Sequence, residues 1–289
     1  MKSYRDILAD AKKGGYAIGH FNFSSFEMLW GVLNAAHKLN VPVLLGLSEG
    51  ERDWVGIRQA VAIVRSLRDE GHEIYLNADH TYSYERVKEA IDAGFDSVIF
   101  DGAKLDINEN IKITKKCVDY ARKAGKQTGR DIIVEGELGY IGEGSTVRDA
   151  LPEGVQMTSA NDAKRFVEET GVDLFAPAVG NVHGMLRAGP PAGGDPPLDL
   201  DRISEIADVV SVPLVLHGGS GTPNLLDGIK AGINEVHIST ELRKAWHDAM
   251  LVHLEEFPDE IAPPKVAHGA LEAIQKVAEA RLKLFSVSQ

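Results

Sequence analysis

The chain has 289 residues, of which 44% are hydrophobic and 26% charged, and its formal net charge is −12. This composition is typical of a globular protein with a full hydrophobic core, and the length suits one large domain spanning residues 1–289. The acidic balance argues against nucleic-acid binding as the main function, since such proteins need a basic surface. A small anionic substrate in a locally positive pocket remains compatible with it.

The beginning of the chain and its cysteine content indicate the compartment. Met1-Lys-Ser-Tyr-Arg-Asp opens an amphipathic helix rather than a signal peptide. No apolar run reaches the length of about 18 residues that a membrane helix needs. The single cysteine, Cys117, cannot form an internal disulfide. We therefore expect a cytoplasmic protein that does not bind membranes.

Short apolar runs alternate with amphipathic segments along the whole chain. The predicted strands are Tyr16–Phe21, Pro42–Leu47, Glu73–Ala78, Ser97–Phe100, Asp131–Glu135, Leu174–Ala178, Pro213–Leu216 and Glu235–Ile238. The predicted helices between them are Phe26–Leu39, Gly56–Asp69, Tyr84–Ala93, Ile107–Ala124, Ala160–Glu169 and Leu200–Val209. Alternating strands and helices indicate parallel pairing, and eight such units predict an α/β fold with a single (β/α)8 TIM barrel. A doubly wound open sheet, the competing fold, usually has fewer strands and a glycine-rich nucleotide loop.

Three segments depart from this alternation. Gly139–Gly154 is a long, polar, glycine-rich loop after the fifth strand, and such loops are usually functional lids or disordered. Arg187–Pro197 is rich in glycine and proline and follows the sixth strand. Pro263–Phe285 is predicted to be a closing C-terminal helix.

Polar side chains gather where the predicted strands end, which is where a (β/α)8 barrel carries its active site. They are His20, Asn22, Ser48, Glu49, Asp79, His80, Asp101, Glu135, Glu137, His183, His217, His237, Ser239 and Thr240. A lone histidine at a strand end is more often hydrogen-bonded scaffolding than a ligand. Three imidazoles that converge beside carboxylates are how catalytic zinc is commonly bound, however. The sequence therefore predicts a metal site formed by His80, His183 and His217.

A second signal is the segment Leu216-His-Gly-Gly-Ser-Gly221, which ends the seventh strand and precedes a helix that begins near Pro223. Glycines let backbone N–H groups approach an anion, and the helix N-terminus adds partial positive charge. The loops after strands seven and eight often bind phosphate in barrels. A tight turn is the simpler interpretation, but the position behind a candidate metal ligand favours phosphate binding by Gly218, Gly219 and Ser220.

A set of ordered motifs points to a known family. They are Phe21-Asn22, Ser48-Glu49-Gly50, Asp79-His80, Phe100-Asp101-Gly102, Glu109-Asn110, Val134-Glu-Gly-Glu-Leu-Gly139, Gly180-Asn-Val-His-Gly184 and Leu216-His-Gly-Gly-Ser-Gly221. With them the chain resembles the class II, metal-dependent fructose-bisphosphate aldolases, including the tagatose-bisphosphate aldolase branch. The likeness runs from about Tyr4 to Leu284.

The resemblance implies roles for particular residues. His80, His183 and His217 would hold one catalytic Zn²⁺, Glu137 would join the metal in some states, and Asp79 would be the catalytic acid/base. Glu143, on the predicted lid, would be a second catalytic group. The substrate and its C1 phosphate would be bound by Asn22, Ser48, Gly184, Gly218, Gly219, Ser220, His237, Ser239 and Thr240. A monovalent cation beside that phosphate would be held by Gly180, Gly218 and Ser220.

The implied reaction is the reversible retro-aldol cleavage of a ketose phosphate. Fructose 1,6-bisphosphate, which gives dihydroxyacetone phosphate and glyceraldehyde 3-phosphate, is the expected substrate. Tagatose bisphosphate or another ketose 1-phosphate is the alternative, because His237 stands where the family usually has asparagine. No lysine ends a strand, and Lys104 lies beyond the fourth, so a Schiff-base route is disfavoured. A homodimer or homotetramer is expected.

Two other functions are weaker. A metal-dependent hydrolase on the same barrel would carry a His-x-His pair on strand one, where this chain has His20-Phe-Asn22. A catalytically inactive, aldolase-like subunit would be expected to lose the acid/base and metal residues. Asp79 and all three histidines are present.

Overall fold

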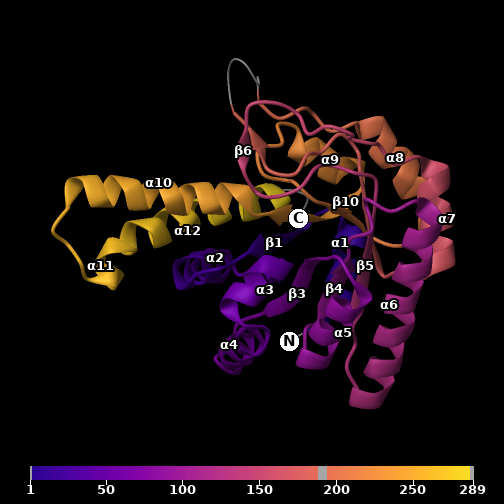
Figure 1. Cartoon of the computed structure of the whole chain (residues 1–289), viewed down its shortest axis with the longest axis horizontal. Coiled ribbons are helices and arrows are strands. Elements are labelled where there is room, and N and C mark those ends of the chain that lie inside the picture. The colour runs from indigo at the N-terminus through magenta and orange to yellow at the C-terminus, as the bar shows by residue number, and fades with distance from the viewer. Residues whose placement is uncertain (1, 188–193, 287–289) are drawn as a thin grey trace.

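The structure, a computed structural model, describes residues 2–187 and 194–286 (Figure 1). Eight parallel strands close into a barrel in the order β1-β2-β3-β4-β5-β7-β9-β10. Their bounds are β1 Ile18–Asn22, β2 Val43–Leu47, β3 Ile74–Thr81, β4 Ser97–Phe100, β5 Ile133–Leu138, β7 Leu174–Pro177, β9 Leu214–Leu216 and β10 Ile233–Ile238. Each overlaps one predicted strand, although β3 and β5 run three residues further than predicted, and the predicted (β/α)8 TIM barrel is confirmed.

Helices follow the strands and pack around the outside of the barrel (Figure 1). They are α2 Phe26–Leu39, α3 Glu49–Val55, α4 Ile57–Asp69, α5 Tyr84–Ala93, α6 Ile107–Thr128, α7 Ala160–Thr170, α8 Leu200–Val209 and α9 Leu225–Ala231. Most begin where a short polar side chain accepts a hydrogen bond from the first turn, as Ser25, Asp106 and Ser159 do. Their apolar faces and the outer faces of the strands form the main core.

A helix closes the end of the barrel at which the strands begin. This helix, α1 (Tyr4–Gly14), buries Tyr4, Ile7, Leu8 and Ala11 against the first inward-facing side chains of the strands, such as Leu44. Apolar side chains therefore fill the barrel interior at the end where the strands begin. Only the carboxyl ends of the strands are left to carry a site.

The C-terminal region differs from the expectation of one closing helix. Pro263–Phe285 forms two helices, α11 (Pro263–Val266) and α12 (His268–Phe285). The preceding helix, α10 (Thr240–Glu256), runs out from the barrel, and with α11 and the first part of α12 it forms a projecting arm (Figure 1). The chain returns along α12, which packs against both α10 and α2.

A small sheet that the sequence did not predict joins the first irregular segment to the residues just before the second. Within Gly139–Gly154, β6 (Val147–Arg148) pairs in parallel with β8 (Met185–Leu186). Of the second segment, Arg187–Pro197, positions 188–193 lie outside the described residues. Among the residues that the structure describes, none of the helices is both long enough and apolar enough to cross a membrane.

Candidate active site

A cavity opens at the carboxyl ends of the strands, and most of the predicted site residues line it. These are Asn22, Ser48, Asp79, His80, Glu143, His183, Gly184, Gly218, Ser220, His237, Ser239 and Thr240. His217 and Glu137 are buried directly beside His80. Residues from all parts of the sequence thus meet at one rim of the barrel.

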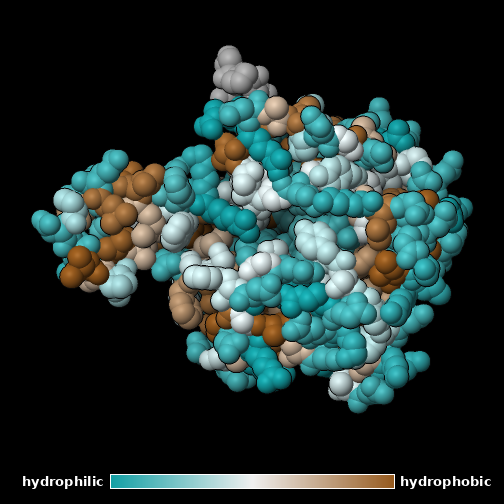
Figure 2. All heavy atoms as spheres, in the orientation of Figure 1, coloured by the Kyte–Doolittle hydropathy of each residue, from teal (hydrophilic) through white to brown (hydrophobic). Residues whose placement is uncertain are grey.

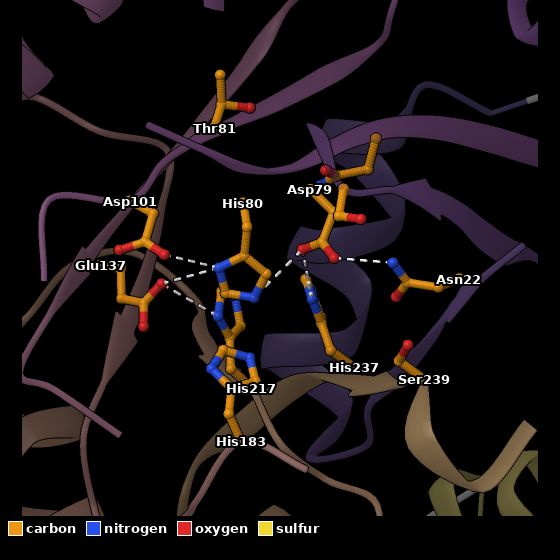
Figure 3. Close-up of polar contacts among 12 residues, drawn as sticks. Asn22, Asp79, His80, Thr81, Asp101, Glu137, His183, His217, His237 and Ser239 are labelled. Carbon is orange, nitrogen blue, oxygen red and sulfur yellow. Dashed lines mark hydrogen bonds and ion pairs between the residues drawn. The ribbon is translucent and has the colours of Figure 1, made fainter. Parts of the chain in front are cut away.

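The three predicted metal-binding histidines converge in this cavity (Figure 3). The ring of His80 lies edge-on to His183 and His217, with centroid distances of 4.4 and 4.7 Å. Each histidine offers a ring nitrogen, and these nitrogens all lie within 4.8 Å of one another. That spacing allows all three to reach a single ion.

One ring nitrogen of each histidine, its outer nitrogen, is held by a hydrogen bond. His80 Nδ1 lies 2.9 Å from the Asp101 carboxylate, and His217 Nε2 lies 2.7 Å from Glu135. His183 Nδ1 donates to the carbonyl of Gly142 at 3.0 Å. Such partners fix the orientation and tautomer of histidines that bind metals, leaving the opposite nitrogen to the ion.

Two buried atoms indicate that this set of donors fits a cation. His217 Nδ1 and Glu137 Oε2 are 3.3 Å apart, and neither has a hydrogen-bond partner. Leaving such groups unpaired in the interior is costly unless something satisfies them. Three imidazoles and one carboxylate are the ligand types that zinc prefers. The residues therefore fit a zinc ion.

The backbone at His80 is unusual for a residue that is not glycine. Its φ angle is 28°, and the pairing between β3 and β4 shifts register between Ala78 and Thr81. Strained backbone of this kind persists where the surroundings hold it in place, and it is common at functional sites. The irregularity lets Asp79 and His80, although adjacent in sequence, both point into the cavity (Figure 3).

Buried carboxylates control the protonation of the histidines. Burial lowers the pKa of His80, but Asp79 and Asp101 outweigh it and raise that pKa to about 9. His217 has its pKa raised well above the usual value, because Glu137 and Glu135 outweigh burial. For His183, burial and the nearby His80 lower the pKa to about 3. The same surroundings therefore shift the three pKa values in different directions, upward for His80 and His217 and downward for His183.

Asp79 is held in place by its neighbours on both sides. Its Oδ2 accepts a hydrogen bond from the Asn22 side chain at 2.9 Å, and its Oδ1 lies 3.5 Å from His237 Nδ1 and 3.8 Å from His80 Nε2. Burial would raise the pKa of this carboxyl group, but the surrounding imidazoles hold it well below the usual value. Asp79 is thus an ionised carboxylate in a buried site.

The imidazole ring of His237 is stacked between the rings of His20 and His217. It lies parallel to His20, with ring centroids 3.5 Å apart, and on its other side is His217 at 4.4 Å. The ring of His20 fits because β2 carries Gly46 there; a Cβ on that residue would lie 2.1 Å from the imidazole. His237 Nε2 is 2.9 Å from Glu235, so both of its ring nitrogens face carboxylates.

The predicted phosphate loop has the expected open backbone, with one exception. Gly218 has a φ angle of 63°, and a side chain there would meet the Val182 carbonyl oxygen at 2.1 Å, so only glycine fits. Gly219 differs from its neighbours in the loop. Its N–H already donates to the carbonyl of His237 at 3.1 Å, and it does not line the cavity.

The predicted lid lies against the cavity. Glu143 lines it and pairs with Lys104, which follows β4. The Ser145 hydroxyl lies 3.3 Å from that of Ser239, and the β6–β8 pair fixes the far side of the loop. The lid is therefore anchored at several points and covers the site.

Two residues that sequence reasoning missed pair beside the cavity, close to the end of β2. Glu51 is buried, and it accepts a hydrogen bond from Arg243 at 2.6 Å. Arg243 lines the cavity and comes from the first turn of α10. The spacing of Ser48 and Glu51 matches a helix capping box, which by itself indicates only the start of a helix. Nothing in the sequence indicates that an arginine 192 residues later meets Glu51.

Comparison with known proteins gives a consistent result. Residues 2–289 match the family described as fructose-bisphosphate aldolase class-II. A fructose-bisphosphate aldolase from Staphylococcus epidermidis is 35% identical over 100% of this chain and 98% of the relative. A 6-phospho-5-dehydro-2-deoxy-D-gluconate aldolase from Shouchella clausii is 36% identical over 98% of this chain and 93% of the relative.

A solved structure agrees with these matches. The YdjI aldolase from Escherichia coli K12 has a TM-score of 0.80 and 30% sequence identity, and the alignment covers 99% of this chain and 98% of that one. The resemblance found in the sequence is thereby confirmed, as are the aldolase and lyase functions that it implied. The chain belongs to the class II fructose-bisphosphate aldolase family.

Proposed function

We propose that the chain is a zinc-dependent aldolase that cleaves and forms the C3–C4 bond of a ketose carrying a phosphate on C1. One catalytic Zn²⁺ would be held by His80, His183 and His217, with Glu137 able to join. The observation that carries the proposal is the convergence of three histidines whose outer nitrogens are all fixed by hydrogen bonds. Bound there, zinc would supply a Lewis acid that stabilises negative charge on the three-carbon fragment.

Asp79 is the proposed acid/base. In cleavage it takes the proton of the C4 hydroxyl as the C3–C4 bond breaks, and in synthesis it returns that proton. It is ionised, as a base must be, and the hydrogen bond from Asn22 directs Oδ2. His237 contacts the other oxygen, which supports a role in positioning Asp79 in addition to the predicted contact with substrate.

The C1 phosphate is proposed to bind where β7, β9 and β10 end. Gly184, Gly218 and Ser220 line this side of the cavity, and Ser239 and Thr240 begin α10. Backbone N–H groups at a helix N-terminus favour an anion. A monovalent cation held by Gly180, Gly218 and Ser220 would lie beside it. Gly219 is left out of this phosphate site, because its N–H is already bonded.

Glu143 is proposed to move the proton that is added to or taken from the reacting carbon of the three-carbon fragment. It lines the cavity from the lid, and half of its side chain is exposed, so it can exchange protons with water. Lys104 holds it in this structure. Closure of such loops also excludes water from reactive intermediates.

A coupled assay on a panel of ketose phosphates, with and without chelator, tests the proposal. Fructose 1,6-bisphosphate comes first, since the staphylococcal relative is named for it, and tagatose 1,6-bisphosphate and fructose 1-phosphate complete the panel. Zinc should copurify in stoichiometric amount, and its removal should abolish cleavage until zinc is restored. Full activity in a verified metal-free preparation would refute the mechanism.

A homodimer or homotetramer is proposed for the assembly. Leu251, Val252 and Leu254 on α10, and Phe257 and Ile261 beyond it, are all exposed. Figure 2 shows hydrophobic residues gathered on the projecting arm. Exposed apolar patches of this kind commonly mark protein interfaces, and a second copy of the chain is the proposed partner. Light scattering should give a multiple of the 31.3 kDa chain mass, and Phe257→Asp with Ile261→Asp should reduce it.

A further inference from the structure

The short helix α3 carries a charged side chain that faces the protein interior. Arg52, on this helix, is only 2% exposed. Its Nη1 donates to the main-chain carbonyls of Leu47 at 2.6 Å and of Asp79 at 2.9 Å. Its Nη2 donates to the hydroxyl of Thr81 at 3.0 Å, so each of these acceptors is uncharged. Burying a guanidinium costs free energy. An apolar side chain would avoid that cost but could make none of these contacts.

The contacts of Arg52 take the place of a missing stretch of β2. Strand β2 pairs with β3 only as far as Leu47 and Ala78, whereas β3 continues to Thr81. In the described part of the chain, β3 is therefore without a strand partner on this side beyond Ala78. Buried carbonyls in such a position need another donor. Arg52 supplies one to Asp79, and the same nitrogen binds the last carbonyl of β2.

The carbonyl of Asp79 belongs to the peptide group that sets the strained angle at His80. The φ angle of His80, 28°, describes how this peptide is turned relative to the Cα of His80. Turning the peptide over would return φ to the negative values that residues other than glycine prefer. It would also point the Asp79 carbonyl away from Arg52. Arg52 therefore opposes the rotation that would relieve the strain.

The irregular part of β3 is held on its other side as well. The Thr81 hydroxyl, besides accepting from Arg52, donates to the carbonyl of Ala78 at 3.3 Å. The Thr81 carbonyl accepts from the N–H of Asp101, which follows β4, at 3.0 Å. The register shift between β3 and β4 falls in the same interval, between Ala78 and Thr81. The end of β4 and Arg52 thus hold this interval from opposite sides.

We infer that Arg52 is a positioning residue of the active site, which holds the Asp79–His80 peptide so that both side chains point into the cavity (Figure 3). The inference rests on the proposed function, in which His80 binds zinc and Asp79 moves the proton. Arg52 is not among the described residues that line the cavity, so it acts through the backbone and not by touching substrate. Loss of its hydrogen bonds should let the peptide relax and displace both side chains.

The variant Arg52→Met keeps a long side chain and removes its hydrogen bonds. Zinc affinity, measured by competition with a chromogenic chelator, should fall by about 10–100-fold, the usual cost of losing a group that orients a metal ligand. In the zinc-saturated variant kcat should fall by about 10–10²-fold, because a small displacement of a catalytic group has an effect of that size. KM should change little, since Asp79 acts on the reaction and not on substrate binding.

The matched control is Arg130→Met. Arg130 also donates to two main-chain carbonyls, those of Ile91 at 3.0 Å and Phe95 at 2.7 Å, but it precedes β5, at the end of the barrel away from the cavity. Both variants should be easier to unfold in urea, and the control should keep wild-type zinc affinity and kcat. If Arg52→Met kept them too, or if the control lost as much, the inference would be wrong.

A second variant, Arg52→Lys, serves if Arg52→Met does not fold. It keeps the positive charge, but an ammonium on a shorter side chain lacks the planar fork that reaches both Asp79 and Thr81. Zinc affinity and kcat should therefore still fall, each by at least about fivefold, within the range seen for groups around a metal site. Wild-type values in Arg52→Lys would overturn the inference.

Failure of this inference is distinguishable from failure of the proposed function. If the wild-type protein binds no zinc and cleaves no ketose phosphate, the proposed function itself falls, and the inference with it. If the wild-type protein does both, and the Arg52 variants equal it in zinc affinity and kcat, only the inference falls. Zinc affinity is measured without turnover, so the test does not depend on which ketose is the substrate.

Discussion

At the scale of single residues, Asp79 and His80 are neighbours in sequence with separate proposed roles. Asp79→Asn should keep the zinc and the fold while lowering kcat by about 10²–10⁴-fold, the usual contribution of a general acid/base group. Zinc content by atomic absorption and the circular dichroism spectrum are the controls. If the variant lost its metal together with its activity, Asp79 would be a ligand or a structural residue instead.

The raised pKa of His80 makes a prediction about zinc binding. Because that pKa is about 9 in the metal-free protein, the imidazole is protonated at pH 7 and zinc must displace the proton. Affinity should therefore rise as pH rises toward 9, by about tenfold per pH unit for each proton released. Calorimetry at pH 7 in buffers of different ionisation enthalpy should show at least one proton released per zinc. Binding without proton release would contradict this, and His247→Ala, an exposed site, should behave as wild type.

The sequence predicted much of the site because the fold places strand ends together. His80, His183 and His217 could each be assigned to a strand end, so their convergence followed from the barrel. The partners of their outer nitrogens, such as the carbonyl of Gly142, could not be predicted, since they depend on how a loop folds back. The same applies to the pairing of Glu51 with Arg243, in which a helix after β10 reaches across β1.

At the scale of elements, an ion pair joins Glu143 on the lid to Lys104, which follows β4. No sequence pattern links these two residues. Lys104→Met should lower kcat by a few-fold and leave KM and stability nearly unchanged, because an exposed ion pair stabilises a fold little while Glu143 loses its anchor. Steady-state kinetics and chemical denaturation measure both effects. Lys112→Met, which breaks an exposed pair with Glu109 on α6, is the control. Equal kinetics in the two variants would remove Lys104 from the mechanism.

Strands and helices were predictable where the apolar pattern was long enough to identify them. All eight barrel strands were found, since each is a buried run bounded by polar residues. The pair β6 and β8 was missed because two residues are too few to show alternation, and both lie in loops rich in glycine and polar residues. The end of α11 at Val266 was missed because neither glycine nor proline marks it.

At the scale of the whole molecule, a polar connection runs from the closed end of the barrel to the site. The Tyr4 hydroxyl on α1 donates to Glu235, which in turn contacts His237 beside Asp79. Tyr4→Phe should lower the free energy of unfolding by about 1–3 kcal/mol, because a buried carboxylate loses its donor. Urea denaturation measures this. Tyr16→Phe, a partly exposed position on the same cluster, should have a much smaller effect, and similar losses in both would contradict the assignment.

Folding of the barrel requires contacts between strands that are far apart in the sequence. Strand β1 pairs with β10, and α2 packs against α12, so β1 and α2 find these partners only once β10 and α12 have been synthesised. Until then a growing chain presents the unpaired edges of β1 and β9, which are buried in the closed barrel and able to pair with other chains while exposed. Contacts between such distant segments form slowly. Pairing of β10 with both β1 and β9 thus removes the two edges through which a nascent chain could aggregate.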